Sequence, residues 1–270
     1  MKSTSKMGTA LITGASSGIG AVYADRLARR GFDLILVARR KTELEALATR
    51  LGASTGAHVR TVVADLSTHD GTAGVETLLQ EDHSIRLLVN NAGTATIGPL
   101  AGADIGRLDR ELQLNIVAPT RLAHAVLPGL LARKQGAIIN IASVMSQMVQ
   151  PGNSVYGGTK AYLLHFSQVL EQEVAGSGVR IQAVLPGATR TDIWNGSGVE
   201  LHQLPEEILM DVDEMVDAAL AGFDHGESVT IPSLPDVADW QRLLAAREAL
   251  KPNLSRQHAA DRYQADSVAA

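Results

Sequence analysis

The chain has 270 residues and a net charge of −5, with 45% hydrophobic and 20% charged residues. This composition is typical of one well-buried domain, and an acidic chain lacks the basic face that nucleic-acid binding needs. Cysteine is absent, which excludes disulfides and thiolate metal sites, and the histidines show no metal-ligand spacing. We find neither a membrane-length apolar run nor a secretory signal. We therefore expect a single domain over residues 1–270, located in the cytoplasm, with residues 1–8 flexible and without metal, nucleic-acid or membrane partners.

Short β-branched runs alternate along the chain with longer amphipathic segments. The runs are apolar throughout, which is typical of strands covered on both faces of a parallel sheet. The expected strands are Thr9–Thr13, Asp33–Ala38, His58–Ala64, Arg86–Asn90, Gly136–Ala142 and Val179–Leu185, with a weaker seventh at Glu227–Ile231. The expected helices include Gly18–Arg30 with Gly31 as C-cap, Lys41–Leu51 with Gly52 as C-cap, Ile105–Ala132 and Ser154–Ala175. This alternation predicts an α/β Rossmann fold, a doubly wound seven-stranded parallel sheet with helices on both faces.

A glycine-rich turn directly follows the first expected strand and opens the first expected helix. Glycines at 14, 18 and 20 let the backbone turn tightly and approach a pyrophosphate without an interposed Cβ. The helix N-terminus adds free N–H groups and a partial positive charge. The alternative, a turn needed only for helix–strand packing, is disfavoured by this placement. The residues expected to contact phosphates are Gly14, Ser16, Ser17, Gly18, Ile19 and Gly20.

The spacing of this turn resembles the TGxxxGIG turn of the short-chain dehydrogenase/reductase family. The resemblance continues in Asn90-Asn91-Ala92-Gly93 after the fourth expected strand, similar to the family's NNAG segment, and in Pro186-Gly187, similar to its PG turn. It implies an enzyme that transfers hydride between a nicotinamide cofactor and a carbonyl or alcohol, with Asn91, Ala92, Gly93, Pro186 and Gly187 near the cofactor. The residues that stand where the family has its catalytic tetrad are Asn115, Ser143, Tyr156 and Lys160.

The end of the second expected strand indicates which nicotinamide cofactor the chain prefers. An acidic residue there binds the ribose 2′-hydroxyl of NAD, whereas a cation suits the 2′-phosphate of NADP. Arg39 and Arg40 occupy this place, so we expect NADP(H), with NAD(H) less favoured. Arg39 is the expected contact to the 2′-phosphate, and Arg40 could share it. The alternative is two solvated arginines at a helix start, and Ser17 stands where some NADP-using family members carry a further basic residue. Asp65 and Leu66, after the third expected strand, are expected to bracket the adenine, although Asp65 could be a plain turn residue.

Tyr156 and Lys160 lie four residues apart in an expected helix and therefore share one face. Ionising a phenol at pH 7 costs roughly 4 kcal/mol, and a neighbouring ammonium lowers that cost. Tyr156 could then give a proton to a carbonyl oxygen as hydride arrives, while Ser143 hydrogen-bonds the same oxygen. The resemblance implies that Lys160 also binds the nicotinamide ribose and that Asn115 holds a water that relays protons. Taken singly, these residues could be a surface pair, a helix N-cap and a satisfied buried amide.

The segment after the PG turn is expected to cover the substrate. Thr191 is expected to bind the nicotinamide carboxamide, with Thr189 a close competitor, and both are placed at the cofactor. Residues 192–210 should form a lid, which contains Trp194, Leu201, Leu204, Ile208 and Leu209. The facing wall is expected from Met145, Met148 and Val149, which suggests an apolar substrate. A generic packed core explains these apolar side chains nearly as well. The expected substrate contacts are Ser143, Met145, Met148, Val149, Tyr156 and Trp194.

The C-terminal part departs from the form common among tetrameric family members. A charged helical tail is expected from Asp236 to about Leu250, continuing to residue 270, in place of a final strand at a subunit interface. A homodimer through the two long helices is favoured over a tetramer, and the tail could instead close over the pocket of its own chain. A catalytically silent NADP(H)-binding redox sensor or scaffold is the competing function, which has no reason to keep Ser143, Tyr156 and Lys160 together.

Overall fold

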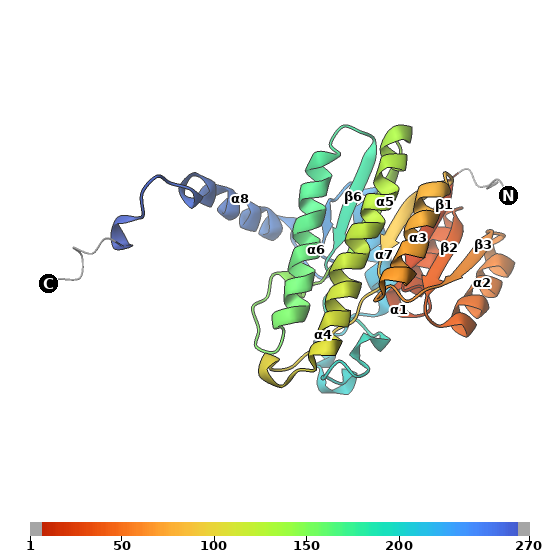
Figure 1. Ribbon diagram of the computed structural model, residues 1–270, viewed down its shortest axis with the longest axis horizontal. Helices are drawn as coiled ribbons and strands as arrows, with labels where there is room; N and C mark the ends of the chain where they lie inside the picture. Colours follow the sequence, from red (N-terminus) through yellow and green to blue (C-terminus); the bar gives the residue numbers. More distant parts are fainter. Residues whose placement is uncertain (1–6, 264–270) are drawn as a thin grey trace. The chain divides into compact units, whose positions relative to one another are not determined.

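Seven parallel strands form one sheet in the order β3-β2-β1-β4-β5-β6-β7 in the computed structural model, which describes residues 7–263 (Figure 1). The order reverses between β1 and β4, which makes the sheet doubly wound and creates a switch point at the carboxyl ends of these strands. The predicted Rossmann fold is confirmed. Most of the segment expected to be flexible, residues 1–6, lies outside the described residues. The strands are β1 Thr9–Thr13, β2 Asp33–Ala38, β3 Val59–Val63, β4 Ile85–Asn90, β5 Gly136–Ile141, β6 Val179–Val184 and β7 Val229–Thr230.

Helices cover both faces of the sheet through two separate apolar clusters (Figure 1). On one face pack α1 (Gly18–Arg29), α2 (Lys41–Thr55) and α7 (Val212–Asp224). On the other face pack α3 (His69–Glu81), α5 (Ala118–Arg133) and α6 (Ser154–Glu173). The central strands β1 and β2 are buried at every position, which is why they contain apolar residues without alternation.

Two details of the sheet and helices differ from the sequence expectation. β3 is an edge strand with a partly exposed face, on which Val63 is 54% exposed, so it is not covered on both faces. The second helix does not end at Gly52; α2 continues to Thr55 and Gly56 takes the left-handed conformation with φ 74°. The physical reason is local. The side chain of Thr55 donates to the carbonyl oxygen of Leu51 at 2.7 Å, and the helix continues past Gly52 for about one more turn.

A single helical run links α4 (Ile105–Leu112), the π-helical segment η2 (Gln113–Val117) and α5. The N–H of Ala118 donates to Gln113, five residues back, as a π-helix requires. Pro119 explains the widening: it has no N–H, and its ring would collide with the carbonyl of Asn115, four residues earlier. The sequence therefore builds a local irregularity at a residue expected to be catalytic.

The run Ile105–Arg133 is long and apolar enough to cross a membrane by length and composition, with 44% of its most apolar window buried inside the fold. This differs from the expectation that the chain has no apolar run of membrane length. A core helix of a globular domain satisfies the same criterion, and α5 contributes seven buried residues, among them Leu122, Val126 and Leu130, to the interior.

The chain divides into two compact units, the first ending at Pro232 and the second beginning at Ser233. The second unit contains α8 (Val237–Leu254) and the short helix η7 (Asp261–Tyr263). Asp236 caps α8 by accepting a hydrogen bond from the N–H of Ala238 at 2.9 Å. The helical tail expected from Asp236 thus starts one residue later, and its last seven residues lie outside the described part of the chain.

Candidate active site

The glycine-rich turn is held in place by the segment that follows β4. The side-chain amide of Asn91 donates to the carbonyl oxygens of Thr13 and Gly14 at 2.9 and 3.2 Å. In return, the Thr13 hydroxyl accepts from the N–H groups of Asn91 and Ala92, both at 3.0 Å. Because β1 and β4 are neighbours, the two motifs meet at the switch point of the sheet. Asn91 and Ala92 therefore hold the backbone of the turn in place through these hydrogen bonds.

The turn combines left-handed glycines with a helix start that has no side-chain cap. Gly14 and Gly18 have φ values of 65° and 52°, which side-chain-bearing residues rarely adopt. Ser17 stands at the N-cap of α1 with an extended backbone but makes no side-chain cap hydrogen bond. The N–H groups of the first turn thus have no capping side chain and remain able to bind an anion. These observations fit a dinucleotide pyrophosphate.

Replacing Gly14 by alanine is expected to destabilise the fold by about 1–3 kcal/mol, because the residue is left-handed and close-packed. A Cβ at this position would lie 2.7 Å from the Asn91 amide nitrogen and 2.9 Å from the Ala92 Cα. Urea unfolding measures the change, and Gly74→Ala is the matched control, since a Cβ there meets nothing within 4 Å. Equal midpoints for the two variants would contradict this account of the turn.

Two arginines follow β2, and Arg40 is the one that the structure places on the turn. Its guanidinium donates to the hydroxyls of Ser16 at 3.1 Å and Ser17 at 2.5 Å. Arg39 is 71% exposed and lies 4.0 Å from the carboxylate of Asp65. Burial acts to raise the pKa of Asp65, but hydrogen bonds from Ser67 and the charge of Arg39 together bring it below its usual range. Both cations thus stand at the edge where a ribose 2′-phosphate is expected.

Tyr156 and Lys160 lie one turn apart on α6, and the Lys160 ammonium nitrogen is 5.7 Å from the centre of the Tyr156 ring. Burial raises the pKa of Tyr156 to about 12, although a hydrogen bond with Ser143 opposes the rise. Burial likewise lowers the pKa of Lys160 to about 8. Lys160 is 4% exposed and donates to the carbonyl oxygen of Ile141, at the end of β5, at 3.0 Å. The three side chains are therefore gathered at the carboxyl end of the sheet.

Ser143 and Asn115 have structural partners beside their expected roles. Ser143 accepts from the N–H of Met145 at 3.1 Å and so caps the short helix η3 (Val144–Ser146). The Asn115 side chain donates to the carbonyl oxygen of Thr94 and the hydroxyl of Thr159 at 2.9 and 3.1 Å. A Cβ on Gly93 would lie 3.2 Å from the Asn115 amide oxygen and 3.5 Å from the Lys160 nitrogen. The glycine of the segment after β4 thus lets these two groups lie close to the backbone.

Glu111 is a buried carboxyl group that the sequence analysis missed. It lies on α4, one turn before Asn115, and is 0% exposed. Burial raises its pKa, while Thr96, Arg107 and Lys160 act in the opposite direction. The signal in the sequence was its spacing, since residues four apart share a helix face. Helix α4 alone would have placed Glu111 equally well in solvent.

The PG turn and the residues after it lie beside the glycine turn. A Cβ on Gly18 would lie 3.2 Å from the side chain of Thr191, whereas Thr189 is 4% exposed and bonds locally to the carbonyl oxygen of Gly187. The indole of Trp194 donates to the carbonyl oxygen of Thr189 at 2.8 Å. Thr191 therefore lies nearer to the expected cofactor. Of the residues expected to form the facing wall, Met148 and Val149 are largely exposed to solvent, at 44% and 103%.

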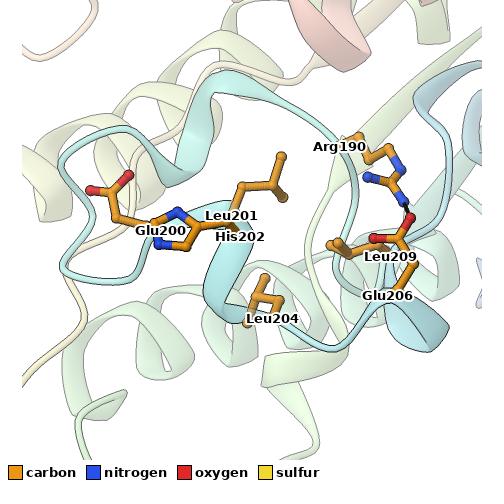
Figure 2. Close-up of a pocket in the computed structure, with 7 residues that line it drawn as sticks. All are labelled: Arg190, Glu200, Leu201, His202, Leu204, Glu206 and Leu209. Carbon is orange, nitrogen blue, oxygen red and sulfur yellow. Dashed lines mark hydrogen bonds and ion pairs between the residues drawn. The ribbon is translucent and has the colours of Figure 1, made fainter.

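The segment expected to form a lid contains three short helices, η4 (Asp192–Trp194), η5 (Leu201–Gln203) and η6 (Glu206–Ile208). It is anchored at Ile97, whose N–H donates to the carbonyl oxygen of Ser197 at 2.7 Å. Arg107 also donates to the carbonyl oxygen of Gly196. Within the segment is a cavity of about 480 Å³ in which leucines face an Arg190–Glu206 ion pair (Figure 2). Its lining residues are Arg190, Glu200, Leu201, His202, Leu204, Glu206 and Leu209.

Comparison with known proteins gives the same family at the level of sequence and structure. The profile of the short chain dehydrogenase family matches residues 8–200. A short-chain dehydrogenase from Sphingobium yanoikuyae, solved in complex with NADPH, is 49% identical over 95% of this chain and 100% of its own, with a TM-score of 0.92. The bulky-bulky ketone specific alcohol dehydrogenase from Comamonas testosteroni is 46% identical over 95% of this chain and 98% of its own, with a TM-score of 0.87.

A curated relative, hydroxysteroid dehydrogenase-like protein 1 of Gallus gallus, is 33% identical over 194 residues, or 70% of this chain. The alignment covers 58% of that relative, so the chain spans less than two thirds of its length. The glycine turn, the Asn-Asn-Ala-Gly segment and the Tyr–Lys pair all lie within the matched residues 8–200. The chain belongs to the short-chain dehydrogenase family.

Proposed function

We propose that this chain is an oxidoreductase that transfers hydride between NADP(H) and a carbonyl compound or secondary alcohol. The observation that carries the proposal is the meeting of Ser143, Tyr156 and Lys160 at the carboxyl end of the sheet. A catalytically silent redox sensor would need the glycine turn but not this set. A bound nicotinamide would supply or accept the hydride, and the remaining chemistry is proton transfer at the carbonyl oxygen, which these residues perform.

Each residue of the set has a distinct task in the proposal. Tyr156 gives its phenolic proton to the carbonyl oxygen in reduction and removes it from the hydroxyl in oxidation. Ser143, whose hydroxyl donates to the carbonyl oxygen of Pro186 at 3.4 Å and accepts from the N–H of Met145 at 3.1 Å, would hold the same oxygen. The buried Lys160 ammonium makes the phenolate less costly, and it would also reach the ribose hydroxyls of the cofactor. Asn115 fixes the backbone around this pair through its hydrogen bonds to Thr94 and Thr159, and it would hold the water that relays protons.

The choice of NADP over NAD rests on the two arginines. Arg40 donates to the hydroxyls of the glycine turn and Arg39 stands beside Asp65, so a 2′-phosphate placed between them would meet two guanidinium groups. The relative from Sphingobium yanoikuyae holds NADPH, and an alcohol dehydrogenase from Thermococcus sibiricus, 26% identical, was solved with 5-hydroxy-NADP. These relatives support the proposed cofactor.

The proposed substrate is a ketone with two bulky apolar substituents, or the corresponding alcohol. The relative from Comamonas testosteroni is specific for bulky-bulky ketones. The leucines of the lid segment, Leu201, Leu204 and Leu209, line a cavity, which supports an apolar cover. We further infer a homodimer, because α5 and α6 carry the exposed apolar residues Leu131 and Val169. A cytoplasmic location stays a prediction from the sequence. Sedimentation measures the dimer and cell fractionation the location.

The experiment that tests the function offers purified protein NADPH together with a panel of ketones, aldehydes and quinones. Oxidation of NADPH is followed by its absorbance, and NADPH binding is measured separately by fluorescence titration. Turnover of a bulky ketone supports the proposal. Tight NADPH binding without turnover of any member of the panel would instead support the redox sensor.

Carbonyl reduction is expected to decline as the pH rises through about 8. Burial holds the pKa of Lys160 near this value, below its ordinary 10.5, so the ammonium that assists Tyr156 is lost on the alkaline side. Because kcat/KM reports groups of the free enzyme, its pH profile for ketone reduction is the measurement. A flat profile between pH 6 and pH 10 would contradict the assignment of Lys160.

A further inference from the structure

Glu111 is a buried titratable group to which the proposed reaction assigns no task. Its side chain is fully enclosed on α4, and among residues 7–263 neither carboxyl oxygen has a partner with full hydrogen-bond geometry. Thr96 lowers the pKa of Glu111 and so opposes part of the effect of burial, but it makes no hydrogen bond of full geometry to either carboxyl oxygen. An ionised carboxylate in such a place is unfavourable unless a cation accompanies it. The role of Glu111 therefore depends on which buried cation accompanies it, Arg107 or Lys160.

The charged and titratable groups that act on Glu111 come from two helices. Arg107 precedes it by one turn on α4. Lys160 and Tyr156 lie on α6, which the hydrogen bond from Asn115, one turn after Glu111, to Thr159 at 3.1 Å joins to this helical run. The charges of Arg107 and Lys160 act on Glu111, and the charge of Glu111 acts on Tyr156. The Arg107 guanidinium already donates to the Thr96 hydroxyl at 3.0 Å, to the carbonyl of Ala95 at 3.1 Å and to the lid. Arg107 therefore serves mainly as an anchor between the loop after β4 and the lid.

Lys160 is the buried cation with donor capacity left. An ammonium has three N–H donors, and Lys160 uses one of them on the carbonyl oxygen of Ile141. Burial lowers the pKa of Lys160, and the charge of Glu111 raises it again. Burial raises the pKa of Glu111, and the charge of Lys160 lowers it. Each group thus makes the charged form of the other less costly.

We propose that Glu111 is a positioning residue that keeps the buried Lys160 ammonium charged in the pH range in which Tyr156 must donate its proton. This inference rests on the proposed function, because it assigns Glu111 to the same proton transfer. Glu111 also raises the pKa of Tyr156 directly, which keeps the phenol protonated until the carbonyl substrate accepts the proton. Both effects extend carbonyl reduction toward higher pH.

The first test compares pH profiles of kcat/KM for ketone reduction. Glu111→Gln is expected to move the alkaline limb to lower pH by roughly one unit, because an opposite charge near an ammonium shifts its pKa by about one to three units. Asp109→Asn is the matched control, since Asp109 is an exposed carboxylate on the same helix and should leave the limb unchanged. An unmoved limb in Glu111→Gln overturns the proposal.

The second test does not depend on activity and uses the protein without cofactor. The free energy of unfolding in urea is measured at pH 7 for the wild type, Glu111→Gln, Lys160→Met and the double variant. With Lys160 present, Glu111→Gln is expected to destabilise; in the Lys160→Met background the same change is expected to stabilise, because it removes an uncompensated carboxylate. Equal effects in the two backgrounds would show that the groups are uncoupled and would overturn the proposal.

The two tests separate this inference from the proposed function. A wild type that reduces no ketone refutes the proposed function, while the unfolding cycle still decides whether Glu111 and Lys160 are coupled. Should Glu111→Gln fail to fold, Glu111→Met, which replaces the carboxyl by an apolar group of similar length, completes the same cycle. Coupling in the cycle together with an unmoved alkaline limb would confine Glu111 to stability and refute its role in proton transfer.

Discussion

Tyr156→Phe is expected to lower kcat for ketone reduction by about 100- to 10,000-fold, the range that a positioned general acid contributes. Phenylalanine preserves the ring and its place on α6 but removes the hydroxyl that would give its proton to the carbonyl oxygen. The measurement is steady-state NADPH oxidation with a bulky ketone. The affinity for NADPH, measured by fluorescence titration, should change by no more than a few-fold.

Tyr162→Phe is the matched control for this variant. Tyr162 lies on the same helix and is 37% exposed, and its hydroxyl hydrogen-bonds only the Thr120 side chain at 2.9 Å among the contacts found within residues 7–263. Its loss should leave kcat within about two-fold, as is usual for a surface substitution. Comparable activity of Tyr156→Phe and Tyr162→Phe would remove Tyr156 from the mechanism.

The double replacement Arg39→Ala and Arg40→Ala is expected to raise the KM for NADPH roughly 10- to 100-fold more than it raises the KM for NADH. A hydrogen bond to a charged group contributes about 1.5–3 kcal/mol, and only NADPH carries the 2′-phosphate that both guanidinium groups would reach. The single variants Arg39→Ala and Arg40→Ala measure how much each arginine contributes to the change in the KM for NADPH. Since Arg40 already donates to Ser16 and Ser17, we expect Arg40→Ala to disturb the turn as well.

Arg50→Ala controls for the loss of a positive charge, on the helix that follows these two arginines. Arg50 lies on α2, ten residues after Arg40, and its guanidinium is 3.7 Å from the carboxylate of Asp25 on α1. Its replacement should leave the ratio of NADPH to NADH preference as it is. An unchanged ratio in the double variant would show that the 2′-phosphate is bound elsewhere or that the chain does not select NADP.

The strands and helices could be predicted well from the sequence because their signals are local and repeated. β1 and β2 begin and end at the residues that the apolar runs predicted, and α1 and α6 differ from the expectation by one or two residues at one end. Such runs are readable since a strand buried on both faces must be apolar at every position. The same reading failed at β3, where an edge position leaves Val63 exposed, and at Gly52, where Thr55 extends α2.

The candidate site was predictable to the extent that its chemistry is written in motifs. The glycine turn, the Asn-Asn-Ala-Gly segment and the pair Tyr156 and Lys160 stand at fixed spacings, and parallel strands bring their carboxyl ends to one edge. The clamp that Asn91 forms on the carbonyl of Thr13 was not predictable, because it joins residues 78 apart. The same holds for the contact of Arg40 with the turn, because the sequence favoured Arg39 as the phosphate-binding residue and the structure places Arg40 on Ser16 and Ser17.

The sequence by itself determined the family and the order of the strands along the chain, and it predicted the candidate catalytic residues, because each depends on local pattern. Only the tertiary structure decided which groups lose water. It buries Lys160 beside Tyr156, widens the helix at Asn115 and encloses Glu111 without a hydrogen-bond partner of full geometry among the described residues. Burial depends on which helices meet across the sheet, and the pKa values of the buried groups follow from it.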